Sequence, residues 1–152
     1  MPSQPVIPPV VWALLFAIAS WAITLISSVD QLLFRSMPIL IGLFGIAGVS
    51  IILLSIKRFA KTGTTANPTT PQNASHLVTS GPYRYTRNPM YFGILLILIG
   101  WAIHQQNLLA FLPVAAFPVT ISRFQIIPEE LALREKFPHD YEAYCKRVRR
   151  WI

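Results

Sequence analysis

Residues 37–56 read MPILIGLFGIAGVSIILLSI, a run of twenty residues without a charged side chain. As an α-helix that rises 1.5 Å per residue, such a run is about 30 Å long, which matches the hydrocarbon thickness of a bilayer. This stretch therefore predicts a membrane-spanning helix, and it decides the class of the fold.

Three further apolar runs lie at residues 10–28, 89–103 and 108–127. The 152-residue chain is 53% hydrophobic and only 12% charged, with a mean hydropathy of +0.50. A water-soluble domain of this size could not bury four such runs. We expect an all-α fold, a polytopic membrane helix bundle with about four transmembrane helices in a single domain. The run at 89–103 is short for a span, so it should extend into its flanks or lie in a thinned bilayer.

The basic residues indicate how the bundle is oriented. The chain has 13 Lys and Arg against 6 Asp and Glu, and most of the cations lie in the loop 57–88 and the tail 128–152. Cations beside membrane spans favour the cytoplasmic side, where they meet anionic headgroups. We therefore expect an integral membrane protein with the loop, the tail and both termini in the cytoplasm, membrane lipid as a partner, and no nucleic acid.

Two of the predicted spans contain residues that affect helix packing. Gly42, Gly45 and Gly48 recur every third position, and small residues let helices approach closely in lipid. The close approach could lie within the chain or between chains, so the oligomeric state stays open. Pro113 and Pro118 predict a bend in the last span.

Residues 81–91, GPYRYTRNPMY, place three tyrosines, two arginines and an asparagine at the start of the third span. Asn88 is expected as its N-cap and Pro89 in its first turn. Tyrosines and arginines also occur at ordinary membrane interfaces, where they contact headgroups. Their density here favours a ligand pocket, and the Thr-, Asn- and Pro-rich segment 62–80 predicts an irregular loop beside it.

The tail 128–152 predicts an amphipathic helix that starts at Pro128. Glu129 and Glu130 follow a span directly, and ionisable groups at membrane depth are functional candidates. Tyr141, Tyr144 and residues 147–151 are expected along the headgroups, with Trp151 as an anchor. Three scattered histidines and a single cysteine predict no metal site and no disulfide.

One ordered set of motifs resembles a known family. It consists of LVTSGPYRYTRNPMYFG at 77–93, an apolar hairpin, Arg123-Phe124 before Pro128-Glu129-Glu130, and then Phe137, Tyr141, Tyr144 and Arg147-Val148. This set, over about 57–152, resembles the isoprenylcysteine carboxyl methyltransferase family and its phospholipid methyltransferase relatives. The resemblance implies an integral membrane enzyme that transfers the methyl group of S-adenosylmethionine to a lipophilic acceptor.

The resemblance also implies site residues. The positions that would hold the cofactor are His76, Leu77, Val78, Tyr83, Asn88, Pro89, Met90, Tyr91 and Glu129. Asn88 stands where the eukaryotic enzymes usually have His; it can donate and accept a hydrogen bond but cannot titrate. On the substrate side the resemblance implies Arg123, with Gln125 as the other residue that could take the place of the family's arginine. Arg123 and Glu129 are the expected catalytic residues.

The chemistry of methyl transfer bears on the acceptor. A carboxylate is already ionised at neutral pH, so its methylation needs alignment and desolvation rather than a strong base. This favours carboxyl O-methylation of an isoprenylcysteine-like or other amphiphilic substrate, with Arg123 paired to the acceptor carboxylate.

Three alternatives stay open at this point. The first is phospholipid N-methylation, for which only Glu129 or Glu130 could serve as a base. The second is an NADPH-dependent membrane reductase of the sterol or enone type, with Arg84 and Arg87 available for the 2′-phosphate. The third is a non-catalytic membrane protein whose polar cluster only contacts lipid.

Overall fold

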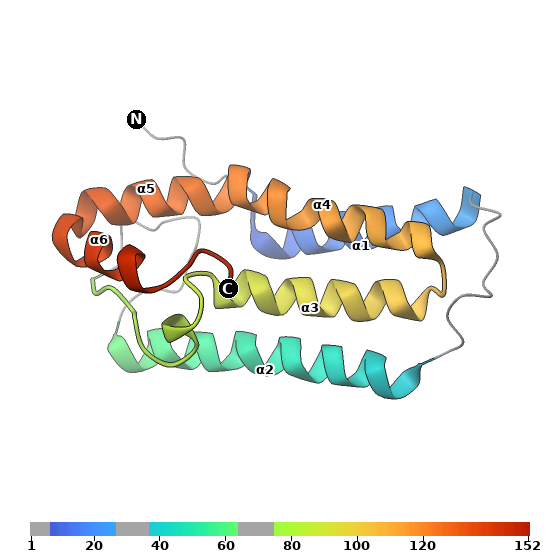
Figure 1. Cartoon of the computed structure of the whole chain (residues 1–152), viewed down its shortest axis with the longest axis horizontal. Coiled ribbons are helices and arrows are strands. Elements are labelled where there is room, and N and C mark those ends of the chain that lie inside the picture. The colour runs from blue at the N-terminus through green and yellow to red at the C-terminus, as the bar shows by residue number, and fades with distance from the viewer. Residues whose placement is uncertain (1–6, 27–36, 64–74) are drawn as a thin grey trace.

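The computed structural model describes residues 7–26, 37–63 and 75–152, and every regular element within them is helical (Figure 1). The elements are α1 (Pro9–Ile26), α2 (Pro38–Thr62), η3 (Gly81–Arg84), α3 (Pro89–His104), η4 (Leu108–Ala110), α4 (Phe111–Ile121), the π-helical turn η5 (Ser122–Ile126), α5 (Ile127–Lys136) and α6 (Pro138–Arg147). The long helices run side by side, so the predicted all-α membrane bundle is confirmed.

Within the part of the chain that the structure describes, three helical stretches are long and apolar enough to cross a membrane: α1, α2 and the continuous stretch Leu108–Lys136. The fourth, α3, has 16 residues and is shorter, in line with the expectation for 89–103. It begins at Pro89 as predicted. The first span starts one residue earlier than expected, and the last two residues of its predicted range 10–28 lie outside the described chain.

The second span is longer than predicted, because α2 continues six residues past Ile56. The prediction stopped at the first charged side chain, Lys57. Lysine and arginine are good helix formers, however, and their long stems can lie on apolar surface while the charge reaches water. The helix ends at Gly63, which adopts a left-handed conformation with φ +62°.

The predicted break between the last span and the tail is wrong. The chain passes from α4 through η5 into α5 without leaving the helix, and only the turn type changes. Within η5 the amide of Ile127 donates to the carbonyl of Ser122, a five-residue step typical of a π-turn. This wider turn comes just before Pro128, whose ring would otherwise meet the carbonyl of Phe124.

The end of the chain turns back toward the bundle. The red helix α6 folds beside α5 and faces η3, and the last residues return to the start of α3 (Figure 1). Tyr141 and Tyr144 are buried, and the indole Nε1 of Trp151 donates to Ser122 Oγ over 3.1 Å. The expectation that Tyr141 and Tyr144 lie along the headgroups is therefore wrong, because protein rather than lipid covers them, and Trp151 is half-buried against η5. Arg147 and Arg149 are exposed.

Helices α2 and α3 touch at two glycines. A Cβ on Gly48 would lie 2.5 Å from the carbonyl oxygen of Gly93, and a Cβ on Gly93 would lie 2.7 Å from that of Gly48. Gly42 and Gly45, the other members of the predicted glycine series, have open space where a Cβ would stand. The close approach thus lies within the chain and involves one glycine of the three.

Candidate active site

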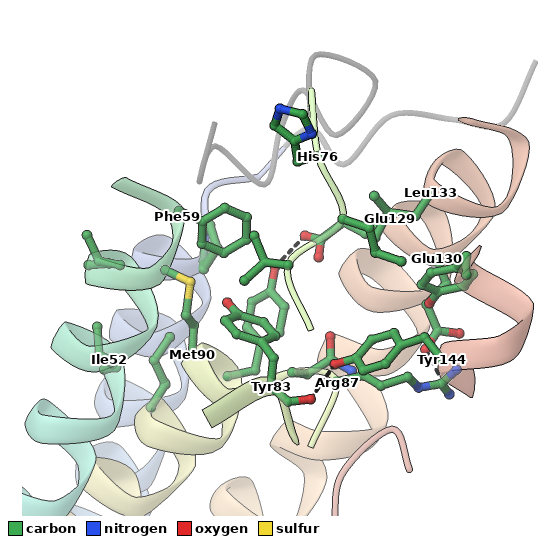
Figure 2. A pocket seen from close by; sticks show the side chains of 18 of the residues that line it. Ile52, Phe59, His76, Tyr83, Arg87, Met90, Glu129, Glu130, Leu133 and Tyr144 are labelled. Carbon is green, nitrogen blue, oxygen red and sulfur yellow. Dashed lines mark hydrogen bonds and ion pairs between the residues drawn. The ribbon is translucent and has the colours of Figure 1, made fainter. Parts of the chain in front are cut away.

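A cavity of about 390 Å³ lies at the end of the bundle where α2, α3, α5 and η3 meet (Figure 2). Phe59 from α2, Met90 from α3 and Glu129 from α5 face the same space. Its walls comprise Pro9, Val10, Ile52, Ile56, Phe59, His76, Leu77, Val78, Tyr83, Arg87, Asn88, Met90, Tyr91, Ile94, Glu129, Glu130, Leu133, Tyr141 and Tyr144. Most of this lining is apolar, and the polar groups gather on the side of η3, α5 and α6.

The structure brings most of the predicted cofactor positions into this one cavity. The residues that line it are His76, Leu77, Val78, Tyr83, Asn88, Met90, Tyr91 and Glu129. Pro89 is fully buried beside them but does not line the cavity, because it forms the first turn of α3. The neighbouring segments 76–78 and 83–91 therefore meet Glu129, which lies 38 positions beyond Tyr91.

The carboxylate of Glu129 is held on one of its oxygens. The hydroxyl of Tyr91 donates to Oε1 of Glu129, and Gln125 Nε2 donates to the same oxygen over 3.0 Å. Figure 2 shows the bond to the tyrosine as a dashed line at Glu129. Among the described residues no hydrogen bond to Oε2 is found, so Oε2 can still accept a hydrogen bond.

Neither residue predicted for the substrate side lines the cavity. Gln125 is completely buried behind Glu129, to which it is hydrogen-bonded. Arg123 is exposed on the π-turn η5 and does not reach the site. The resemblance implied Arg123 because it is the cation just before the acidic pair, but a π-turn changes the direction in which each side chain points.

Glu130 is neutralised by two arginines. Arg87 Nη2 lies 3.2 Å from Glu130 Oε1, and Arg150 binds the same carboxylate with two bonds, of 2.7 and 3.1 Å. The hydrogen bonds to Glu130 raise the pKa of Arg150. Arg87 also donates to the sulfur of Cys145. Because its charge is already paired, Arg87 is a poor partner for the 2′-phosphate of NADPH.

Tyr83 forms a buried aromatic wall of the cavity. Its ring meets Phe59 edge to face, with centroids 5.5 Å apart, and its carbonyl accepts a hydrogen bond of 2.7 Å from the hydroxyl of Tyr144. Burial raises the pKa of Tyr83 well above its usual value. The phenol therefore stays neutral and offers a ring face rather than a charge.

Tyr141 and Tyr144 line the cavity, although the sequence prediction left them outside the site. Both are almost fully buried, at 2% and 3% exposure, and burial raises the pKa of each. The signal was present in the sequence: Phe137, Tyr141, Tyr144 and Val148 recur at steps of four, three and four, which is the spacing of one buried helix face.

Asn88 occupies the predicted N-cap position of α3, but its side chain does not cap the helix. Its Nδ2 instead donates to the carbonyl of Arg150 over 3.0 Å. The hydroxyl of Thr86 accepts from the amide of Asn88 and donates to the same Arg150 carbonyl. The end of the chain is thus part of the wall around Asn88.

Several known proteins are similar in sequence to part of this chain. A Haemophilus influenzae protein with the name "Uncharacterized protein" is 44% identical over 63 residues, which cover 41% of this chain and all of that protein. Two proteins of Oryza sativa, from subspecies indica and japonica, are each named "Probable protein-S-isoprenylcysteine O-methyltransferase". Each is 38% identical over 76 residues, which cover 47% of this chain and 38% of the rice protein.

No solved structure matches the chain significantly. The sequence model of the phospholipid methyltransferase family, by contrast, matches residues 37–140, which is more than half of the chain and includes α2, η3, α3, α4 and α5. This membrane helix bundle, with Tyr83, Tyr91 and Glu129 around one cavity, belongs to the phospholipid methyltransferase family.

Proposed function

We propose that the chain is an S-adenosylmethionine-dependent methyltransferase that acts on a lipophilic acceptor. The observation that carries this proposal is the meeting of Glu129 with Tyr83 and Tyr91 in one cavity whose remaining walls are largely apolar. Family membership and the name of the rice relatives support it.

The lining residues fit this cofactor. A cavity of about 390 Å³ is within the usual range for small-molecule sites. Oε2 of Glu129 can accept from an amino or hydroxyl group, and the neutral ring of Tyr83 can face a cation. The residues that would hold it are those at 76–78 with Tyr83, Asn88, Tyr91 and Glu129. The cofactor, when bound, supplies a methyl group on a positively charged sulfur.

The chain's own part in the reaction is to align and to exclude water. Ile52 and Ile56 of α2 with Ile94 of α3 give the cavity an apolar side that suits the hydrocarbon part of an acceptor. The basic residues near the end of α2, Lys57, Arg58 and Lys61, favour a cytoplasmic location for this end of the bundle and for both termini.

Two acceptor classes follow from the relatives. The rice proteins suggest an isoprenylcysteine-like carboxylate, and the family description suggests a phospholipid. A carboxylate would find Arg87 already paired with Glu130 and Arg123 outside the cavity, whereas an amine would find Glu129 as a proton acceptor. The amine is therefore a specific second candidate.

A methyl-transfer assay distinguishes the two acceptor classes. It compares the incorporation of labelled methyl groups into N-acetyl-S-farnesylcysteine and into phosphatidylethanolamine, side by side in vesicles.

Isothermal titration of detergent-purified protein with S-adenosylhomocysteine tests the cofactor itself. We expect micromolar binding that Glu129→Gln and Tyr83→Ala weaken by about 10-fold or more, because each removes a group that faces the ligand. Glu135→Gln and Tyr85→Ala are the matched controls, since both side chains are exposed. If folded wild-type protein does not bind S-adenosylhomocysteine but its thermal stability rises with NADPH, the result would support the reductase instead.

A further inference from the structure

Residues 149–151 pass across the start of α3 and connect it to α5. We infer that Arg150 is a positioning residue, which holds the segment 86–88 in place so that Asn88 presents its carbonyl oxygen to the bound cofactor. The inference rests on the proposed function in one respect only, the identity of the ligand.

The side chain of Arg150 fixes this segment to α5. Its Nε and Nη2 bind the two oxygens of Glu130 at 3.1 and 2.7 Å, in the fork-to-fork geometry that is the strongest arrangement of an arginine with a carboxylate. The Glu130 side chain is 12% exposed and the Arg150 side chain 38%, so the carboxylate is the sheltered partner of the pair. Trp151, the next residue, is held by its bond to Ser122. The backbone at residue 150 is therefore anchored by the Arg150 side chain and by the side chain of Trp151.

The backbone of the same segment holds the residues before α3. The carbonyl of Arg150 accepts from Thr86 Oγ1 and from Asn88 Nδ2, each over 3.0 Å. The amide of Arg87 donates to the carbonyl of Arg149 over 2.9 Å. Three consecutive residues, 86–88, are thus tied to two consecutive carbonyls.

These bonds leave the side-chain oxygen of Asn88 for a ligand. One N–H of its amide nitrogen donates to the carbonyl of Arg150, while the residue itself lines the cavity. The side-chain oxygen accepts hydrogen bonds, and no donor to it is found among the described residues. Asn88 therefore offers this oxygen as an acceptor, and we expect the ligand group that meets it to be an N–H or O–H donor.

Arg149 provides a matched control. It carries the same charge at the neighbouring position, but its side chain is exposed and only its backbone carbonyl takes part in the contacts. Replacement of Arg149 with Ala removes one positive charge and leaves the anchor in place. Replacement of Arg150 with Ala removes the same charge together with the anchor.

The test measures S-adenosylhomocysteine affinity for wild type, Arg150→Ala, Arg149→Ala, Asn88→Ala and the double variant Arg150→Ala/Asn88→Ala. We expect Arg150→Ala and Asn88→Ala each to raise the Kd about 10-fold or more, Arg149→Ala to leave it unchanged, and the double variant to be no weaker than the weaker single variant. Such non-additivity identifies residues that act as a unit. Wild-type affinity in Arg150→Ala, or effects that simply add in the double variant, would overturn the inference. If Arg150→Ala does not fold, Arg150→Lys, which keeps the charge but not the fork, is judged by the same criteria.

Hydrogen–deuterium exchange of residues 84–92 tests the positioning without any ligand. Arg150→Ala should speed exchange at the amides of Arg87 and Asn88 relative to Arg149→Ala, because their acceptors are no longer held. Failure of wild type to bind S-adenosylhomocysteine would refute the proposed cofactor while this comparison still decides the role of Arg150. Equal exchange in the two variants would refute the positioning role.

Discussion

The hydroxyl of Tyr91 in α3 donates a hydrogen bond to the carboxylate of Glu129 in α5, and so joins two residues that are 38 positions apart. Gln125, one helical turn before Glu129, donates to the same oxygen. One donor of the carboxylate belongs to α3, and the other belongs to η5, directly before α5. The orientation of Glu129 is therefore a property of the packed bundle rather than of α5 alone.

Replacement of Tyr91 with Phe should weaken S-adenosylhomocysteine binding by about 10-fold, because the carboxylate loses a donor and can turn away from the cavity. The ring remains, so the bundle should keep its thermal stability to within a few degrees. Isothermal titration and thermal unfolding in the same detergent measure both effects. Tyr85→Phe, at an exposed position, controls for loss of a hydroxyl. An unchanged affinity in Tyr91→Phe would mean that Gln125 alone orients Glu129.

Replacement of Arg123 with Ala should leave cofactor binding unchanged, because its side chain is exposed on η5 and away from the cavity. Arg87→Ala removes the same charge but leaves the largely buried carboxylate of Glu130 with one partner fewer, so it should lower thermal stability. A strong loss of affinity in Arg123→Ala would show that Arg123 reaches the ligand in the bound state.

Replacement of Gly48 with Ala should destabilise the bundle, because its Cβ would stand 2.5 Å from the carbonyl oxygen of Gly93 and would push α2 from α3. Gly45→Ala has open space at the corresponding point and gains helix propensity, so it should be neutral or slightly stabilising. Thermal unfolding in detergent compares them. Equal unfolding temperatures would contradict a tight contact at Gly48.

Alkaline pH should destabilise the folded protein. Burial raises the pKa values of Tyr83, Tyr141 and Tyr144, whereas phenols of the unfolded chain ionise near pH 10. Their contribution is complete below about pH 10 and is lost as the pH rises further, by about 1.4 kcal/mol per pH unit for each phenol at most. Unfolding at pH 8, 10 and 11 measures the slope, which Tyr144→Phe should reduce. A slope that Tyr144→Phe leaves unchanged would assign the effect to other groups.

The sequence was sufficient to predict the bundle because membrane spans depend on local composition. The run at 37–56 has no charge to interrupt it, and Pro89 marks the start of α3 in the ordinary way. Errors arose at span ends. Lys57 suggested an end that a helix does not require, and Pro128 suggested a start where the helix was already under way.

The site could be predicted in part, through positions that match a family motif. Tyr83, Tyr91 and Glu129, which the resemblance implied for the cofactor, line one cavity, but the contact between Tyr91 and Glu129 depends on how α3 packs against α5. The role of Arg150 was not predictable from its neighbours, because a run of arginines beside a tryptophan is also typical of a membrane surface. Only the tertiary structure shows that Arg150 pairs with Glu130.

The π-turn at residues 122–126 determines the direction, around the helix axis, in which the side chains that follow it point. Such a turn holds one residue more than an α-helical turn, and one residue corresponds to a rotation of about 100° around the helix axis. Glu129, Glu130 and Leu133 all lie downstream and all face the cavity. A variant that lacks one residue of this turn would keep every side chain and every charge of α5, yet would rotate them by about 100° away from the cavity.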